Sequence, residues 1–375
     1  MTAARHSAFH RLRVAGVDRI TDDAVALTFE VPPALRETYR FTPGQHVTLR
    51  RFTGPDGGAE IRRTYSVCDP APHGDGGWPA GGGPAALRVG VRLVEGGAFS
   101  PYALKELLAG DEIEVMAPAG RFGLAGLAAG DGGHFAAVVG GSGITPVLSI
   151  AATVLASRPA ARFCLVRSDR TAASTMFLDE VADLKDRYPG RFQLVQVLSR
   201  EEQQAGLPSG RLDGERLAAL LPALLPVGRV DAWFLCGPYG LVSGAERALS
   251  DLGVDRSRVH QEIFHVDDGT GVPATAVAGE RSGVAGTVHA TLDGRGGSWA
   301  SRDGESLLET VLRNRADAPY ACKGGVCGTC RAKLVAGEVR MDRNFALEPE
   351  ELDAGYVLAC QSHPVTEKVE LDFDA

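Results

Sequence analysis

The spacing of hydrophobic residues changes along the chain and divides it into regions. Residues 1–125 hold short runs rich in Val, Leu, Thr and aromatic residues, separated by turns rich in Pro and Gly. The predicted strands include Ala24–Val31, His46–Arg51 and Ala86–Leu93, with a helix near Pro101–Leu108 and a surface loop over His73–Pro84. This spacing predicts an antiparallel β-barrel or sandwich.

Residues 131–265 alternate short apolar runs with longer amphipathic ones. The predicted strands are Phe135–Val139, Phe163–Val166, Phe192–Leu198 and Ala232–Cys236, and the predicted helices are Pro146–Leu155 and Phe177–Arg187. Strands that alternate with helices predict a doubly wound, parallel α/β sheet. The uncharged stretch Phe135–Ala156 is long enough to cross a bilayer, but Gly and Pro in its middle favour a strand, a turn and a helix instead.

A third region follows a stretch that is poor in bulky side chains. Residues 266–285 are typical of a linker. Residues 286–375 then form a separate unit, in which Val288–Leu292 predicts a strand and Glu305–Arg313 predicts a helix with its leucines on one face. The chain is therefore expected to have three domains and a linker.

Composition narrows the class of protein. The chain has 375 residues and a net charge of −8, which argues against a nucleic-acid partner. It has seven cysteines, an odd number, and charged residues near the N-terminus where a secretory signal would be apolar. We therefore expect reduced thiols, a cytoplasmic location and no association with a membrane.

The strongest chemical signal is a group of four cysteines in the third region, Cys322, Cys327, Cys330 and Cys360. Their C-x4-C-x2-C…C spacing is that of plant-type 2Fe–2S proteins, in which four thiolates hold two irons. Glycines inside the loop allow it to wrap tightly and let backbone N–H groups face the sulfurs. The alternative is a structural zinc site, although zinc ribbons usually pair two short cysteine knuckles.

A second signal is the glycine-rich turn Gly140–Pro146, which follows a predicted strand and opens a predicted helix. Small residues let the backbone approach a pyrophosphate, and the helix N-terminus favours the anion. The turn differs from the G-x-G-x-x-G pattern of dinucleotide-binding folds. Such a turn is weak evidence for nucleotide binding on its own, because any tight strand–helix connection can contain one.

Taken in order, the motifs resemble the ferredoxin–NADP reductase family, with a C-terminal domain similar to the β-grasp fold of plant-type ferredoxins. The resemblance implies FAD as a cofactor, held by Arg63, Thr64, Tyr65 and Ser66, which match R-x-Y-S. In that family the arginine pairs with the flavin pyrophosphate, the tyrosine covers the isoalloxazine ring, and the serine, counted as catalytic, lies near N5. Gly97 and Ser100 resemble the family's second phosphate-binding segment.

The same resemblance implies a nicotinamide nucleotide. The family's G-x-G-x-x-P variant is matched by Gly141, Gly143 and Pro146, with Thr145 beside the proline. Cys236, Gly237 and Pro238 match the segment whose cysteine lies beside the nicotinamide and counts as catalytic, although a buried cysteine is more often inert. Glu262 and Phe264 match the E-x-F ending of this domain, near the flavin and the nicotinamide.

The choice between NADPH and NADH depends on the end of the second strand of the nucleotide domain. An acidic residue there binds the ribose 2′-hydroxyl of NAD, whereas arginine accommodates a 2′-phosphate. Arg170 lies where the resembled reductases carry arginine, and Ser168 lies two residues before it. Asp169 stands between them, and Gly-Asn-Arg is the family's usual sequence. NADPH is the expected nucleotide, with NADH as the alternative.

These parts predict an electron-transfer enzyme. A nicotinamide gives up two electrons as hydride, a 2Fe–2S cluster accepts one, and a flavin handles both, so the expected order is NADPH, FAD, cluster. The sequence offers no oxygen-activating centre, so a partner must receive the electrons. Much of the negative charge lies in residues 286–375, which is either a solvated face or a surface that steers docking to a basic oxygenase.

Closer matching of Pro319–Cys330, Ala346–Glu351, Gly355–Gln361 and Asp372–Ala375 shows a resemblance to the reductase subunits of phenylacetyl-CoA epoxidases. That resemblance implies a di-iron oxygenase partner that epoxidises the ring of phenylacetyl-CoA. The nearest alternative is the reductase of another multicomponent oxygenase, such as steroid 9α-hydroxylase. A ferredoxin-type carrier without nucleotide oxidation, and a scaffold that holds a structural metal, remain as alternatives of other classes.

Overall fold

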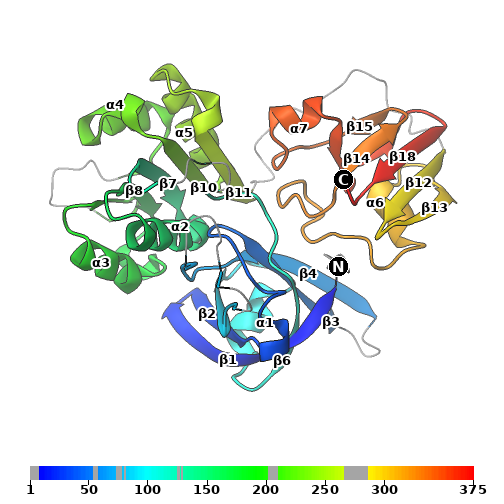
Figure 1. The fold of residues 1–375 in the computed structure, drawn as a ribbon, viewed down its shortest axis with the longest axis horizontal. Helices are drawn as coiled ribbons and strands as arrows, with labels where there is room; N and C mark the ends of the chain where they lie inside the picture. The colour runs from blue at the N-terminus through cyan, green and yellow to red at the C-terminus, as the bar shows by residue number, and fades with distance from the viewer. Residues whose placement is uncertain are drawn as a thin grey trace. The chain divides into compact units, whose positions relative to one another are not determined.

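The computed structural model of the chain describes residues 8–53, 58–72, 78–79, 82–124, 127, 130–201, 210–265 and 286–375. These residues fall into two compact units (Figure 1). Of the described residues, the larger unit takes in 10–61 and 65–265, and the smaller takes in 8–9, 62–64 and 286–375. The predicted linker 266–285 and much of the predicted loop His73–Pro84 lie outside the described residues, so the predicted domain limits stay predictions.

The larger unit begins with a six-stranded sheet of order β4-β3-β6-β1-β2-β5, whose described pairings are antiparallel. Its strands are β1 (Phe9–Thr21), β2 (Ala24–Glu30), β3 (His46–Thr53), β4 (Ala59–Ser66), β5 (Ala86–Arg92) and β6 (Glu112–Met116). Val67, just after β4, bridges to Val89 of β5 and so joins the two ends of the sheet. The short helices of this part are η1 (Pro33–Leu35) and α1 (Ser100–Lys105). The predicted antiparallel barrel is confirmed.

Strand β2 shows why the barrel and the following domain form one unit. Val25, Leu27 and Phe29 are buried in the barrel core. Ala24 and Ala26, on the opposite face, are buried in the core of the nucleotide domain. The strand is therefore apolar on both faces, because alternate side chains enter two different cores.

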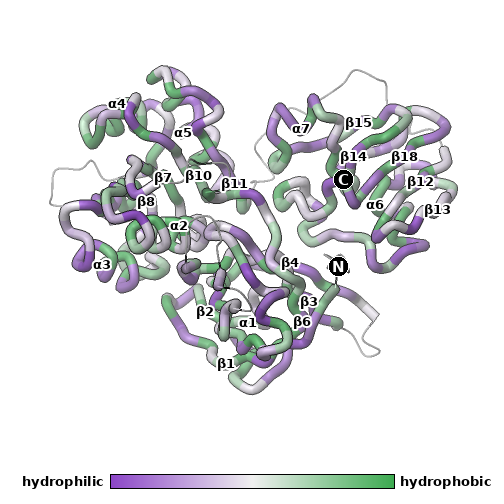
Figure 2. The backbone as a smooth tube through the Cα atoms, viewed as in Figure 1, coloured by the Kyte–Doolittle hydropathy of each residue, from purple (hydrophilic) through white to green (hydrophobic). Residues whose placement is uncertain are grey.

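The rest of the larger unit is a five-stranded parallel sheet of order β11-β10-β7-β8-β9. Its strands are β7 (His134–Gly140), β8 (Arg162–Asp169), β9 (Phe192–Leu198), β10 (Ala232–Pro238) and β11 (Val259–His265). Its helices are α2 (Ile144–Ser157), α3 (Leu178–Arg187), α4 (Gly214–Leu224) and α5 (Tyr239–Asp251), with short turns η2 (Gly141–Gly143), η3 (Ala172–Ser174), η4 (Val227–Arg229) and η5 (Arg256–Arg258). β7, the first strand of this sheet along the chain, lies in its middle, as in a doubly wound fold. Strand β10 and helix α2 are strongly hydrophobic (Figure 2).

The starts of α2 and α3 differ from the predicted ones for local reasons. Helix α2 begins at Ile144 rather than at the predicted Pro146, because proline is tolerated in the first turn of a helix. Helix α3 begins at Leu178 rather than Phe177, because Phe177 has a left-handed conformation with φ 55°. None of the described helices is long and apolar enough to cross a membrane, and the uncharged stretch Phe135–Ala156 forms β7, a glycine turn and α2.

The smaller unit contains a mixed sheet of order β13-β12-β18-β14-β16, in which β12 and β18 are parallel. Its strands are β12 (Thr287–Leu292), β13 (Arg295–Ala300), β14 (Arg331–Ala336), β16 (Tyr356–Leu358) and β18 (Lys368–Asp372), and β15 (Val339–Met341) pairs separately with β17 (Ser362–Pro364). Its helices are α6 (Leu307–Leu312) and α7 (Pro349–Asp353). Helix α6 starts two residues after the predicted Glu305, because Ser306 caps it reciprocally with Glu309.

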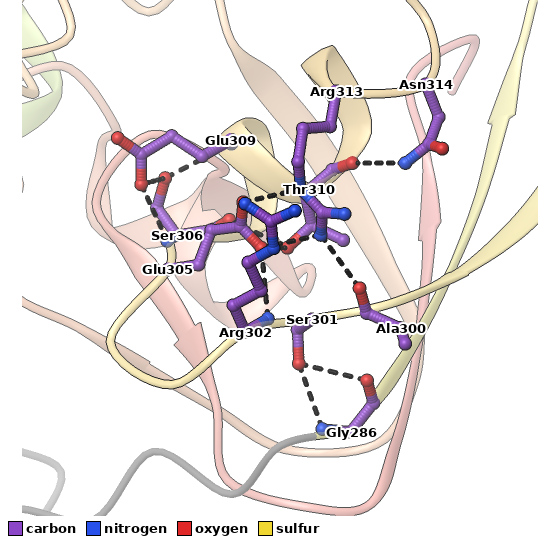
Figure 3. A network of polar contacts seen from close by, with 10 residues as sticks. All are labelled: Gly286, Ala300, Ser301, Arg302, Glu305, Ser306, Glu309, Thr310, Arg313 and Asn314. Atoms are coloured by element: carbon purple, nitrogen blue, oxygen red, sulfur yellow. Dashed lines mark hydrogen bonds and ion pairs between the residues drawn. The ribbon is translucent and has the colours of Figure 1, made fainter.

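A polar network supports the start of this unit (Figure 3). The Ser301 hydroxyl accepts a hydrogen bond from the Gly286 N–H and donates one to the Gly286 carbonyl, both at 2.9 Å. Two guanidinium N–H groups of Arg313 donate to the two carboxylate oxygens of Glu305 at 2.8 Å. This hydrogen-bonded pair lowers the pKa of Glu305 to about 2. The network fixes the segment between β13 and α6.

Candidate nucleotide, flavin and cluster sites

The glycine turn lies at the carboxyl edge of the parallel sheet, between β7 and α2. Gly141 has φ 55°, a left-handed conformation that suits glycine. A Cβ on Gly143 would lie 2.2 Å from the carbonyl oxygen of Cys236, so only glycine fits there. The Thr145 hydroxyl donates to the carbonyl of Ser142 at 3.0 Å, and Pro146 lies in the first turn of α2. The turn thus brings backbone and a helix N-terminus to one edge, as phosphate binding requires.

The end of β10 packs directly against this turn. Gly237 has φ 144°, and a Cβ there would lie 3.0 Å from backbone atoms of Gly140. Pro238 ends β10 and precedes α5. Burial raises the pKa of the Cys236 thiol well above its usual range, and the nearby Glu262 charge raises it further. Cys236 lies in the hydrophobic core of the nucleotide domain, where the thiolate form is disfavoured.

Glu262 and Phe264 come from the neighbouring strand β11. Glu262 pairs in register with Cys236, which places the two residues next to each other in the sheet. One oxygen of Glu262 lies 3.8 Å from Nδ1 of His46, a buried residue at the start of β3 in the barrel. Phe264 packs against the core of the nucleotide domain. The structure therefore brings the glycine turn, Cys236 and Glu262 together, and adds His46 to the group.

The R-x-Y-S motif occupies the end of β4. Arg63 is exposed, and its guanidinium donates to the carbonyl of Arg62 at 2.7 Å. Thr64 and Tyr65 are half-buried, and Ser66 is buried. An exposed guanidinium, an aromatic face and a hydroxyl at one strand end are the groups that suit a flavin with its pyrophosphate.

The second predicted phosphate-binding segment meets this motif through aromatic rings. The ring of Tyr65 lies 5.6 Å from the ring of Phe99, the residue before Ser100. The Ser100 hydroxyl accepts a hydrogen bond from the N–H of Val94 at 2.9 Å. A Cβ on Gly97 would lie 2.8 Å from the carbonyl oxygen of Val94, so the turn is tight. In this structure Ser100 stabilises the turn, and its predicted contact with phosphate stays a prediction.

The end of β8 carries the residues predicted to select the nucleotide. Ser168 is half-buried and Arg170 is exposed. The N–H of Arg200, two residues past β9, donates to the carbonyl of Arg170 at 2.8 Å, so two arginines stand side by side at this edge. The Asp169 side chain is buried, and it accepts a hydrogen bond from Nε of Arg167 at 2.7 Å. Asp169 is thus turned into the protein and does not stand beside Arg170 as a free carboxylate.

The four predicted cluster ligands meet in the smaller unit. Hydrogen bonds from the Cys327 thiol and from three backbone N–H groups of the loop lower the pKa of Cys322 to about 5. A hydrogen bond from the Cys330 thiol lowers the pKa of Cys360 in the same way. One of the loop's donors, the Gly324 N–H, lies 3.3 Å from the Cys322 sulfur. Cys322 and Cys360 therefore lie where the thiolate, the form that binds metal, is stabilised. The same hydrogen bonds, together with burial, raise the pKa of the donor thiols Cys327 and Cys330 well above its usual range.

The loop conformation also fits a 2Fe–2S cluster. Lys323, Gly325 and Gly328 all have positive φ, at 53°, 78° and 67°, which turns the backbone tightly around the sulfurs. The amide of Gln361 donates to the carbonyl of Lys323 at 2.9 Å and lies 3.6 Å from the Cys360 sulfur. This amide ties the distant fourth cysteine to the loop. The donor set, four sulfurs surrounded by N–H groups, is the one such a cluster needs.

Sequence reasoning missed three residues of these sites. His46 follows the Pro43-Gly44-Gln45 turn and gives no signal of its own. Arg200 is a basic residue two positions after an apolar strand, a pattern that could have pointed to the nucleotide edge. Arg167 lies inside an apolar strand, where a buried arginine is unexpected.

Comparison with known proteins agrees with this geometry. A 2Fe-2S iron-sulfur cluster binding domain matches residues 290–365, and an oxidoreductase NAD-binding domain matches residues 138–247. The chain is 44% identical to a component of the 1,2-phenylacetyl-CoA epoxidase of Escherichia coli (strain K12), over 98% of both chains. It is 32% identical to the ferredoxin reductase component of 3-ketosteroid-9-alpha-monooxygenase of Rhodococcus rhodochrous, over 96% of both chains.

A solved structure has the same modular fold. Phthalate dioxygenase reductase, described as a modular structure for electron transfer from pyridine nucleotides to a 2Fe–2S centre, aligns with a TM-score of 0.58 over 98% of each chain, at 24% identity. The order of barrel, nucleotide domain and cluster domain is thus that of a known reductase fold. With the two relatives above, these findings show that the chain belongs to the family of reductase components that serve multicomponent oxygenases.

Proposed function

We propose that the chain is the reductase of a phenylacetyl-CoA epoxidase, which moves electrons from NADPH to an oxygenase subunit with FAD and a 2Fe–2S cluster as its redox groups. A flavin accepts electrons in pairs and a cluster accepts them singly, which is the chemistry these groups supply when bound. The observation that carries the proposal is the meeting of four cysteine sulfurs in the same chain as a nucleotide-binding glycine turn.

The proposed roles of the residues follow from their positions. Cys322, Cys327, Cys330 and Cys360 hold the cluster. For FAD, the Arg63 guanidinium would bind the pyrophosphate, Thr64 and Tyr65 would lie beside the ring system, and the Ser66 hydroxyl would hydrogen-bond to it. Gly97 and Ser100 would shape the second phosphate-binding turn. For the nicotinamide nucleotide, Gly141, Gly143, Thr145 and Pro146 form the pyrophosphate turn, and Cys236, Gly237, Pro238, Glu262 and Phe264 border the nicotinamide.

NADPH is the proposed nucleotide because of the charges at the end of β8. The exposed Arg170 and the neighbouring Arg200 place positive charge where a 2′-phosphate would lie, with Ser168 as a further hydroxyl donor. The buried Asp169 is already paired with Arg167, so it is not available to the ribose of NADH. This distribution of charge favours the 2′-phosphorylated nucleotide.

The partner surface is proposed on the cluster unit. The acidic segment before Cys360 forms α7, in which Glu350, Leu352 and Asp353 are exposed. Glu351 does not belong to that surface, because it is buried and accepts a hydrogen bond from Arg331 at 3.2 Å. An exposed leucine between two carboxylates is suited to a basic partner with an apolar centre.

We place the protein in the cytoplasm. All seven cysteines are free thiols in the structure, and four of them are required by the cluster. Disulfides form mainly in oxidising compartments, so a reducing one suits this chain.

A reconstitution experiment tests the proposed function. The purified chain is mixed with the oxygenase of a phenylacetyl-CoA epoxidase, NADPH and phenylacetyl-CoA, and both NADPH and the thioester are followed. We expect oxygen-dependent conversion of phenylacetyl-CoA to its ring-epoxidised thioester, and this conversion should require both proteins. We expect little turnover when a 3-ketosteroid 9α-monooxygenase oxygenase and its steroid replace the epoxidase oxygenase and phenylacetyl-CoA. Turnover of the steroid without turnover of the thioester would assign the chain to the other branch of the family.

A further inference from the structure

Two charged side chains, Arg167 and Asp169, lie buried side by side in β8. The residue roles proposed above give neither of them a direct contact with a cofactor. Arg167 and Asp169 are two residues apart and so project from the same face of the strand. Nε of Arg167 donates to Oδ2 of Asp169 at 2.7 Å, and each side chain is only 1% exposed. A second N–H of the Arg167 guanidinium donates to the carbonyl of Met176 at 3.0 Å. Arg167 is therefore fixed at two points and holds the carboxylate inside the protein.

The position of this pair connects it with nucleotide selection. Asp169 is the last residue of the second strand of the nucleotide domain, where an acidic side chain commonly binds the ribose 2′-hydroxyl of NAD. Here the carboxylate faces inward, while the next residue, Arg170, is exposed. The backbone of Arg170 also accepts a hydrogen bond from Arg200, so both arginines stand at the same edge.

The ion pair of Arg167 with Asp169 determines the net charge beside Arg170 at the end of β8. An unpaired carboxylate one residue from Arg170 would repel a 2′-phosphate and attract the arginine that should bind it. In the described part of the chain, Oδ1 of Asp169 and Nη1 of Arg167 have no hydrogen-bond partner. Removal of Arg167 would therefore leave the Asp169 carboxylate without its ion-pair partner. Loss of one member of a buried pair leaves the other charge uncompensated.

We propose that Arg167 is a positioning residue that sets the preference for 2′-phosphorylated nucleotides by withdrawing the Asp169 carboxylate from the ribose site. The inference rests on the proposed use of NADPH and adds to it.

The test measures binding without turnover, with adenosine 2′,5′-bisphosphate and 5′-AMP as probes. Isothermal titration of the oxidised, cofactor-loaded full-length protein gives a dissociation constant for each probe. We expect Arg167→Met to weaken the bisphosphate about tenfold and 5′-AMP less than about twofold. Asp169→Asn in the Arg167→Met background should restore the bisphosphate to within about threefold of the wild type.

Other outcomes would overturn the inference. Equal weakening of both probes in Arg167→Met, or no recovery in the double variant, would give Arg167 a purely structural role. If Arg167→Met does not fold, the isosteric Asp169→Asn decides, because the inference predicts unchanged 5′-AMP binding there. A clear loss of 5′-AMP affinity would mean that Asp169 binds the ribose.

The wild type tests the underlying proposal separately. Equal binding of the two probes by the wild-type protein would contradict the proposed use of NADPH. In that case a bisphosphate-to-AMP affinity ratio that still falls in Arg167→Met would support the role of the pair, and an unchanged ratio would refute it.

Discussion

Replacing Gly143 by alanine should disable the nucleotide site by a backbone collision. The added Cβ would lie 2.2 Å from the Cys236 carbonyl oxygen, 2.5 Å from its carbon and 2.8 Å from the Gly237 nitrogen, whereas real Cβ contacts essentially never fall under 3.0 Å. All three atoms belong to the backbone of β10, which cannot rotate aside as a side chain could. The turn and β10 must therefore move apart. Overpacking of this kind costs about 3 kcal/mol of unfolding free energy.

Chemical denaturation and NADPH titration measure the two effects. We expect a lower unfolding free energy and a large loss of NADPH affinity, because β10 and the glycine turn form the same edge. Gly190→Ala is the matched control, since a Cβ there meets nothing within 4 Å, and it should change stability by less than about 1 kcal/mol. Wild-type stability and NADPH affinity in Gly143→Ala would refute the close packing of these segments.

Three further predictions concern the other sites. Cys327→Ser should remove the iron–sulfur absorbance and leave the flavin reducible by NADPH. The control Cys164→Ser, at a buried cysteine, should keep the iron–sulfur absorbance and the flavin reduction. Loss of flavin reduction in Cys327→Ser would contradict separate redox units. Arg170→Ala should raise the Michaelis constant for NADPH at least about tenfold and that for NADH far less, and equal effects would exclude it as a 2′-phosphate ligand. The pair of Glu305 with Arg313 should make a small contribution to stability, because solvent screens it. Because the folded pKa of Glu305 is lowered to about 2, this stability is present above its ordinary value near 4.5 and lost as the pH falls toward 2, so urea denaturation of Glu305→Gln should show a shallower acid dependence than the wild type.

Local patterns in the sequence were enough to predict most of the fold. The alternation of apolar runs located β2, β5, β7 and β9 to within a residue or two, because each strand must bury a whole face. The spacing of Cys322, Cys327 and Cys330 predicts that these residues lie close together, since the loop between them is too short to separate them; their binding of a cluster stays a prediction. These are features that a few neighbouring residues decide.

Contacts between distant segments could not be predicted in this way. Nothing in the sequence indicates that His46 lies near Glu262, because more than two hundred residues separate them. The direction of Asp169 was equally hidden. Sequence placed it beside Arg170 as a competing charge, whereas strand alternation and the partner Arg167 turn it inward. The shared burial of β2 in two cores likewise depends on how the barrel meets the nucleotide domain.

The most direct test of the central claim is an anaerobic absorbance titration of the purified protein with NADPH and, separately, with NADH. We expect the flavin band and the iron–sulfur band both to bleach, and NADPH to bleach them at a lower concentration than NADH. A protein without visible absorbance, or one whose iron–sulfur band stays unchanged while the flavin is fully reduced, would contradict it.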